Sequence, residues 1–230
     1  DKKESLQRIG DARIVLTNKT PLDEEVLNAA PNLEYIGILA TGYNIIDIDA
    51  ATKAGITVTN VPAYGTEAVA QFTFALLLEI TSQVGLHNRL VHEGQWSSNP
   101  DFSFFATPLT ELQGKTLGLV GFGRIAQKVA EIGHAFGMKV IFYNHRPKNV
   151  KAEWLQQVSL NELLSQSDVV SLHVPQTPDT KELINSSSLQ KMKNTGILIN
   201  TARGGLINEA DLAEALNNEQ LAVAAMDVAQ

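Results

Sequence analysis

The stretch GLVGFGRIAQ, residues 118–127, narrows the choice of fold more than any other part of the sequence. It joins a short apolar run to a helical pattern through Gly121, Gly123 and Ala126. In a strand–turn–helix unit, the first glycine permits the tight turn, the second lets the backbone approach a pyrophosphate, and the alanine keeps helix and strand closely packed. The amides of the helix N-terminus then point at the anion. We therefore expect a dinucleotide site here; a glycine-rich turn with a purely structural role is the alternative.

Apolar runs and helical patterns alternate along the rest of the chain. We expect strands at residues 12–17, 35–40, 56–60, 116–121, 138–143, 168–174, 196–200 and 221–228, and helices at 21–30, 48–54, 66–92, 124–136 and 208–217. Ser159 and Glu162 form a capping-box pair that opens a further short helix. This alternation predicts an α/β fold with parallel sheets covered on both faces. We expect a small α/β domain at residues 1–65 and a Rossmann-type doubly wound domain at residues 66–230.

The expected helix at residues 66–92 is apolar on two sides. Two sets of residues follow helical spacing on different faces: Val69, Phe72, Leu76 and Ile80, and Phe74, Leu77 and Leu78. A helix that is apolar on two sides is buried on two sides. We expect this helix to lie between domains or between subunits.

The end of the expected strand at residues 138–143 bears on the choice of cofactor. It is followed by Asn144, His145 and Arg146, with Lys148 nearby. The dinucleotide fingerprint has an acidic residue at the position of Asn144 to bind the ribose, whereas an arginine nearby accommodates a 2′-phosphate. NADP is therefore at least as good a candidate as NAD. The alternative is that the two cations are solvated loop charges.

Polar residues also follow the other strands of the expected Rossmann sheet. In such a sheet the ligand lies outside the carboxyl ends of the strands. The later ends carry His173–Pro175, Thr201–Arg203 and Asp227, which we expect near the nicotinamide and the substrate. Arg203 thus falls where chemistry would occur. A structural arginine that caps a helix is the alternative.

Composition excludes several classes of function. The 230 residues carry a net charge of −7, which argues against nucleic acid or an anionic membrane as a partner. The absence of cysteine excludes disulfides, thiolate metal sites and thiol nucleophiles, and we expect no metal site. No apolar stretch is long enough to span a bilayer, and we expect a cytoplasmic protein.

Five segments together resemble the D-isomer-specific 2-hydroxyacid dehydrogenases. They are ATGYNIIDIDAATKAGITVTNVPAYGTEAVAQ, ELQGKTLGLVGFGRIAQKVA, SDVVSLHVPQTPDTKELIN, KMKNTGILINTARGGLINEADLAEAL and AAMDV, and they span nearly the whole chain. Looser similarity around NPDFSFFATPLTEL is nearest to the glycerate dehydrogenase, hydroxypyruvate reductase and glyoxylate reductase group. The resemblance implies a flavodoxin-like substrate domain before the Rossmann domain, a homodimer through the helix at 66–92, and a small 2-keto or D-2-hydroxy acid as substrate.

The resemblance also implies roles for individual residues. Arg203 would be the catalytic residue that binds the substrate carboxylate and polarises the keto oxygen, a task that suits a bidentate, permanently charged guanidinium. The loop that contains Gly42 and Tyr43 would offer backbone amides to the same carboxylate. The positions expected to bind NAD or NADP are Gly121, Gly123, Arg124, Ile125, Asn144, His145, Arg146, Val174, Pro175, Thr180, Thr201, Ala202 and Asp227.

The family's other two catalytic residues, a Glu and a His, lie beyond the AAMDV segment. This sequence ends at Gln230, so we expect a chain truncated at the C-terminus, incomplete at both ends and weakly active or inactive alone. None of the five internal histidines is assigned as the acid or base. Two other functions are considered: an NAD(H)-sensing scaffold that binds partner proteins without turnover, and a Rossmann oxidoreductase of unrelated chemistry. An aromatic loop is expected either to close over the substrate or to pack at a hinge or dimer interface; it contains Trp96, Phe102, Phe104 and Phe105.

Overall fold

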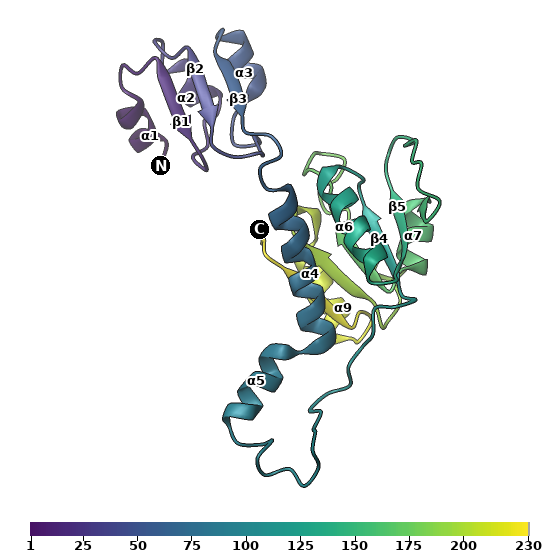
Figure 1. Cartoon of the computed structure of the whole chain (residues 1–230). Coiled ribbons are helices and arrows are strands. Elements are labelled where there is room, and N and C mark those ends of the chain that lie inside the picture. Colours follow the sequence, from purple (N-terminus) through teal and green to yellow (C-terminus); the bar gives the residue numbers. More distant parts are fainter. Residues whose placement is uncertain (230) are drawn as a thin grey trace. The chain divides into compact units, whose positions relative to one another are not determined.

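The computed structural model describes residues 1–229. The chain divides into two compact units at the bond between Gly65 and Thr66. Figure 1 labels their helices and strands along the chain. Each unit has its own parallel sheet and its own apolar core.

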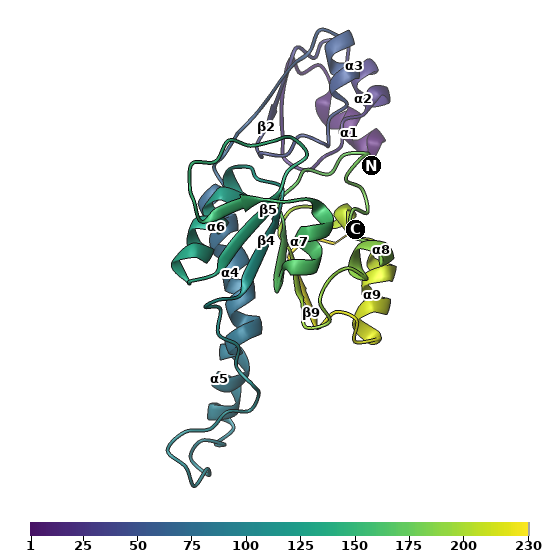
Figure 2. The same cartoon turned by 90° about the vertical axis from the view of Figure 1, so that its right-hand side faces the viewer.

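The first unit contains a three-stranded parallel sheet in the order β1-β2-β3, formed by Ile14–Thr17, Tyr35–Ile38 and Thr57–Asn60. Its helices are α1 (Lys2–Ile9), α2 (Glu24–Asn28) and α3 (Ile48–Lys53), and Figure 2 shows all three on one side of the sheet. Asp1, Asp23 and Asp47 each accept a hydrogen bond from the first turn of the following helix. On the opposite face Ile14 and Leu16 are 65% and 63% exposed.

The second unit contains a six-stranded parallel sheet in the order β6-β5-β4-β7-β8-β9. The strands are β4 (Thr116–Val120), β5 (Lys139–Tyr143), β6 (Leu155–Gln157), β7 (Val169–Leu172), β8 (Ile197–Asn200) and β9 (Val223–Met226). Renumbered within the unit, this is the 3-2-1-4-5-6 order of a Rossmann sheet. The order reverses between β4 and β7, so the helices that follow these two strands lie on opposite faces of the sheet and leave a crevice at its carboxyl edge.

Helices cover both faces of this sheet, as Figure 2 shows. The helices α4 (Thr66–Ser82) and α6 (Arg124–Ala135) pack on one face, and α7 (Leu160–Gln166), α8 (Ser186–Leu189) and α9 (Glu209–Asn217) lie on the other. The expected capping box at the start of α7 is confirmed: Ser159 accepts from the Glu162 amide, and the Glu162 carboxylate accepts from the Ser159 amide. The apolar strands are buried on both faces because each is sandwiched between these two helical layers.

The prediction of one continuous helix at residues 66–92 is wrong. The helix breaks at Gln83, which has a left-handed φ of 46°, and α5 (Val84–His92) begins after it. In a continuous helix the Thr81 carbonyl would accept from the Gly85 amide. Here it accepts from Thr110, on the chain segment that returns from α5, while the Gly85 amide donates to the Glu79 carboxylate.

The burial of α4 is also one-sided within this chain. Its buried residues lie on one face: Ala70, Thr73, Phe74, Leu77 and Thr81. On the other face Phe72 is 44% exposed, and α5 has no buried residue at all. Figure 1 shows α5 and the segment after it extending as an arm from the rest of this unit. Within the second unit, therefore, only one side of α4 is buried.

Four short elements differ from the sequence expectations: α1, α8, β6 and the 3-10 helix η1 (Gly204–Leu206). The helices α1 and α8 and the strand β6 are each eight residues or fewer, and their sequences are polar: KKESLQRI, SSSL and LQQ. Contacts made elsewhere in the chain stabilise them. In α1, for example, Lys2 forms ion pairs with Asp23 and Glu25.

Among residues 1–229, no single helix is long and apolar enough to cross a membrane. Only α4 and α5 taken together meet the limits of length and composition, and they are bent by 56° at their break.

Candidate functional site

The glycine turn after β4 has two glycines with different structural constraints. Gly121 has a φ of 92°, and a Cβ added there would lie 2.6 Å from the carbonyl oxygen of His173 and 2.7 Å from Cγ1 of Val174. Only glycine fits, because the turn after β7 passes directly against it. Gly123 has ordinary extended backbone, and an added Cβ would meet no atom within 4 Å. The fold itself therefore requires the first glycine but not the second.

The helix α6 begins directly after this turn. Its N-cap, Gly123, supplies no side-chain acceptor, so the amides of the first turn have no capping oxygen from that residue. Ala126 is fully buried in the first turn of the helix, which keeps α6 close to the sheet. Uncapped amides and the helix dipole together favour an anion at this position.

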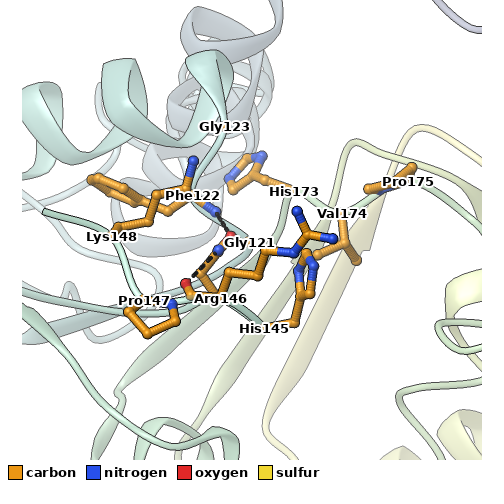
Figure 3. A pocket seen from close by; sticks show the side chains of 11 residues that line it. Gly121, Phe122, Gly123, His145, Arg146, Pro147, Lys148, His173, Val174 and Pro175 are labelled. Carbon is orange, nitrogen blue, oxygen red and sulfur yellow. Dashed lines mark hydrogen bonds between the residues drawn. The ribbon is translucent and has the colours of Figure 1, made fainter.

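A cavity of about 430 Å³ opens beside the turn (Figure 3). Its wall comes from the segments after β4, β5 and β7: Gly121, Phe122, Gly123, Asn144, His145, Arg146, Pro147, Lys148, His173, Val174 and Pro175. Seven of the residues expected to bind cofactor thus line one cavity: Gly121, Gly123, Asn144, His145, Arg146, Val174 and Pro175. Phe122 and Pro147 were missed, although the fingerprint that contains Phe122 was recognised.

The polar groups of the cavity favour an anionic ligand. The Asn144 amide is occupied: its Oδ1 accepts from the Phe122 amide at 3.3 Å, and its Nδ2 donates to the Arg146 carbonyl at 2.8 Å. No carboxylate lines the cavity. Arg146 and Lys148 are exposed and form no ion pair with any of residues 1–229. The wall after β5 therefore carries uncompensated positive charge.

His173 lies at the end of β7 and contributes a neutral ring to the wall. Its Nε2 is 2.9 Å from the Ser171 hydroxyl, which is fully buried. Burial lowers the pKa of His173 to about 4, because the charged imidazolium would lose its hydration. The ring is therefore uncharged near neutral pH, which does not suit a group that must hold a proton before donating it.

Arg203 follows β8 at the same edge of the sheet, where its backbone is held by Asn200. The buried Asn200 side chain accepts from the Ala202 amide at 3.0 Å and donates to the Arg203 carbonyl at 2.9 Å. The Arg203 side chain is exposed, and its Nη1 donates to the Ala202 carbonyl at 2.7 Å. Arg203 is the N-cap residue of the short 3-10 helix Gly204–Leu206, but its side chain forms no capping hydrogen bond there, so the helix-capping alternative gains no support from the guanidinium.

The remaining residues expected to bind cofactor lie outside the cavity wall, although most lie at the same edge. Thr201 is buried, and its hydroxyl is 3.0 Å from that of Thr73 on α4. Thr180 donates to the Pro175 carbonyl and accepts from the Thr177 amide, so it shapes the loop after β7. Asp227 is exposed after β9, and the other three are Arg124, Ile125 and Ala202.

The loop expected to bind the substrate carboxylate belongs to the first unit and follows β2. Gly42 is half-buried and Tyr43 is exposed. Thr41 anchors the loop, because its hydroxyl donates to the Val61 carbonyl at 3.0 Å and its carbonyl accepts from the Asn60 side chain at 2.8 Å. The backbone around Gly42 is thereby fixed to the end of β3.

The strand order, the glycine turn and the cationic cavity together define a Rossmann-type dinucleotide-binding domain. Residues 74–230 match the family described as D-isomer specific 2-hydroxyacid dehydrogenase, NAD binding domain. The chain belongs to this family, and the expected family and Rossmann-type fold are confirmed.

The chain is 49% identical over 229 residues to the hydroxypyruvate reductase of Blautia hydrogenotrophica, covering 99% of this chain and 71% of that protein. Two solved structures are also similar. An acyclic imino acid reductase in complex with NADPH and D-Arg superposes with a TM-score of 0.89 at 34% identity, covering 100% of this chain and 73% of that one. D-Lactate dehydrogenase from Aquifex aeolicus, complexed with NAD and lactic acid, gives a TM-score of 0.85 at 34% identity, covering 98% and 67%.

These comparisons establish an NAD(P)-dependent oxidoreductase, and NAD or NADP as its cofactor. The cavity could hold either NAD or NADP, because it lies beside the glycine turn and the start of α6, and an added Cβ at Gly123 would meet no atom within 4 Å. Within residues 1–229, no group of three or more histidine, aspartate or glutamate side chains is placed to hold a metal ion.

Proposed function

We propose that the protein transfers a hydride between a nicotinamide cofactor and a small 2-keto or D-2-hydroxy acid, such as glyoxylate or hydroxypyruvate and D-glycerate. The observation that carries the proposal is Arg203, whose backbone Asn200 fixes while its guanidinium stays exposed at the carboxyl edge of the sheet. The glycine turn that receives the cofactor lies at this same edge. The hydroxypyruvate reductase similarity points to the same class of substrate.

In this proposal the guanidinium of Arg203 binds the substrate carboxylate through two parallel hydrogen bonds and polarises the keto oxygen. A nicotinamide held beside the glycine turn would supply or accept the hydride, and the family's catalytic histidine would supply or accept the proton on the substrate oxygen. As negative charge develops on the keto oxygen, Arg203 stabilises it, because its own charge does not titrate near neutral pH. Its contact with the Ala202 carbonyl has to open first. The amides of Gly42 and Tyr43 are proposed as further donors to the carboxylate.

For the cofactor we propose a preference for NADP over NAD. Asn144 stands where a carboxylate would bind the ribose diol, and both ends of its amide already bond within the protein. Arg146 and Lys148 line the cavity beside it and form no ion pair with an acidic residue within residues 1–229. A 2′-phosphate would supply the missing negative charge. The other cofactor contacts proposed are His145, Arg124, Ile125, Val174, Pro175, Thr180, Thr201, Ala202 and Asp227.

We further propose that residues 1–65 are the substrate domain, that residues 66–230 bind the cofactor, and that the protein is a cytoplasmic homodimer. Exposed apolar side chains on α4, α5 and the following arm support a dimer through α4 and α5. Phe102 is 94% and Phe105 71% exposed, and Phe72, Val84, Val91 and Trp96 are also exposed. Exposed apolar surface on this scale is typical of an interface.

A steady-state assay tests the function. Glyoxylate, hydroxypyruvate and pyruvate are each measured with NADH and with NADPH, for the unchanged full-length protein and for its Arg203→Gln and Arg203→Lys variants. We expect kcat/KM to fall about 10²–10⁴-fold in Arg203→Gln, and nearly as far in Arg203→Lys because lysine cannot bind both carboxylate oxygens in the same plane. The control is Arg8→Gln, an exposed arginine on α1.

Tight NADPH binding by the full-length protein without turnover of any of these acids would contradict the enzyme proposal and favour the protein-binding scaffold. Unchanged turnover in Arg203→Gln would contradict the role of the arginine alone.

A further inference from the structure

We propose that Gln157, on the edge strand β6, is a positioning residue that gives the cofactor site its preference for a 2′-phosphate. It lies outside the cavity wall and acts through the loop that carries the cavity's cations. This inference rests on the proposed NADP preference. It adds a residue that neither the glycine fingerprint nor the family's catalytic positions include.

The Gln157 side chain binds three members of the loop at residues 144–148. Its Oε1 accepts from the Lys148 amide at 2.9 Å. Its Nε2 donates to the Asn144 carbonyl at 3.0 Å and to the Arg146 carbonyl at 3.3 Å. Both ends of one amide are therefore used to close one loop.

Asn144 forms a further hydrogen bond to the Arg146 carbonyl. Its Nδ2 donates to the Arg146 carbonyl at 2.8 Å, so that carbonyl accepts from two side-chain amides. The backbone of Arg146 is thereby fixed from inside the loop by Asn144 and from the neighbouring strand by Gln157. Figure 3 shows the side chains of His145, Arg146 and Lys148 extending from this loop at the cavity.

The position of Gln157 is itself fixed by the sheet. It pairs with Phe142 in β5, and the adjacent Val158 amide donates to the Phe142 carbonyl at 2.9 Å. Phe142 is fully buried and stacks on Phe122 with ring centroids 3.9 Å apart. We call the three hydrogen bonds from Gln157 to this loop the clamp. The clamp is held by the core of the sheet, whereas Arg146 and Lys148 themselves are exposed.

This arrangement has a consequence for binding. An exposed cation on a free loop must lose conformational entropy when it closes on a phosphate, and a loop already fixed by hydrogen bonds has less entropy to lose. Arg146 and Lys148 bear on the 2′-phosphate, whereas the pyrophosphate is received by the glycine turn and the start of α6, which Gln157 does not contact. Loss of the clamp should weaken NADPH binding and leave NADH binding nearly unchanged.

The test compares Gln157→Met, Gln157→Ala and the control Gln156→Ala. Methionine keeps the length of the side chain but removes both hydrogen-bonding ends, and Gln156 is an exposed glutamine on the same strand. Dissociation constants are measured by fluorescence titration for NADPH and NADH, and for the fragments 2′,5′-ADP and 5′-AMP, with thermal melting as a check of folding. In Gln157→Met we expect NADPH and 2′,5′-ADP to bind about 10-fold more weakly, and NADH and 5′-AMP to change less than about 2-fold.

Each outcome decides the inference. Equal weakening of both cofactors would overturn it, because Gln157 would then support the domain and not its selectivity. An unchanged NADPH to NADH ratio at unchanged affinity would overturn it as well. If the unchanged protein binds 5′-AMP as tightly as 2′,5′-ADP, the proposed NADP preference fails and this inference with it. If the unchanged protein binds 2′,5′-ADP more tightly than 5′-AMP and Gln157→Met keeps that difference, the role of Gln157 is refuted but the NADP preference is not.

Discussion

The two glycines of the turn after β4 should respond in opposite ways to the same added methyl group. Gly121→Ala places a Cβ 2.6 Å from a backbone oxygen, in a residue whose φ is 92°. Gly123→Ala places a Cβ where no protein atom lies within 4 Å, in a residue with extended backbone. We expect Gly121→Ala to damage the fold and Gly123→Ala to damage only cofactor binding.

The size of each effect follows from these geometries. A positive φ costs a non-glycine residue roughly 1–2 kcal/mol, and forcing an atom into packed surroundings adds about 1–3 kcal/mol. Gly121→Ala should therefore lower the free energy of unfolding by about 2–5 kcal/mol. Gly123→Ala should change it by less than about 1 kcal/mol, since neither cost applies and only the weak N-cap preference for glycine is lost. If the pyrophosphate occupies the space beside Gly123, NADPH should bind about 10–100-fold more weakly.

Urea denaturation and NADPH fluorescence titration measure the two effects, and Gly114→Ala is the matched control. Gly114 has a φ of 76° but no atom within 4 Å of an added Cβ, so it isolates the cost of φ from that of the clash. We expect it to lose only about 1–2 kcal/mol. Equal destabilisation by Gly121→Ala and Gly114→Ala would refute the steric argument, and unchanged NADPH affinity in Gly123→Ala would refute the assignment of the space beside it to the cofactor.

Three further predictions concern the rest of the site and the proposed dimer. Asn200→Ala removes two partly buried hydrogen bonds of a fully buried side chain and should destabilise the protein by about 1–3 kcal/mol, with a fall in kcat/KM for the keto acid that exceeds any loss of NADPH affinity. The pKa of His173 is lowered to about 4 in the folded protein, so as the pH falls the unfolded chain binds a proton at this residue before the folded protein does. Above about pH 6.5 the ring is neutral in both states and has no effect on the free energy of unfolding. Between about pH 6.5 and about pH 4 the folded protein should lose up to about 3 kcal/mol of stability through this residue. Urea denaturation at pH 5 and pH 7.5 should show a smaller loss for His173→Gln than for the unchanged protein, and an equal loss would contradict the lowered pKa. Phe72→Asp and Val91→Asp should shift the protein from dimer to monomer in light scattering, whereas an unchanged mass would place the interface elsewhere.

Local patterns account for what the sequence predicted well. Strands of four or five apolar residues, the capping box at Ser159 and the glycine turn each depend on neighbours within a few positions of the chain. The parallel order then follows from strand–helix alternation, which brings the carboxyl ends of the strands to one edge. The sequence therefore predicts which residues lie along that edge, from Asn144 to Arg203.

Features that depend on distant contacts could not be predicted. The break at Gln83 needs Thr110 to take the carbonyl of Thr81, and nothing in residues 66–92 indicates it. The strand β6 has only three residues, two of them glutamine, and gains its structure by pairing with β5. Gln157 was missed for the same reason, since its role appears only once β6 lies beside the loop after β5.

The order of the strands also places the residues proposed for cofactor selectivity far from the arginine proposed for substrate binding. The clamp on the cofactor loop is built on β6 and Arg203 follows β8, four strand positions away in the sheet. At the usual spacing of neighbouring strands this is about 19 Å. Substitutions so far apart, with no partner in common, should have additive effects on free energy. The choice between NADP and NAD can therefore be changed at one end of the sheet without altering which acid is bound near the other, and each can be selected or engineered separately.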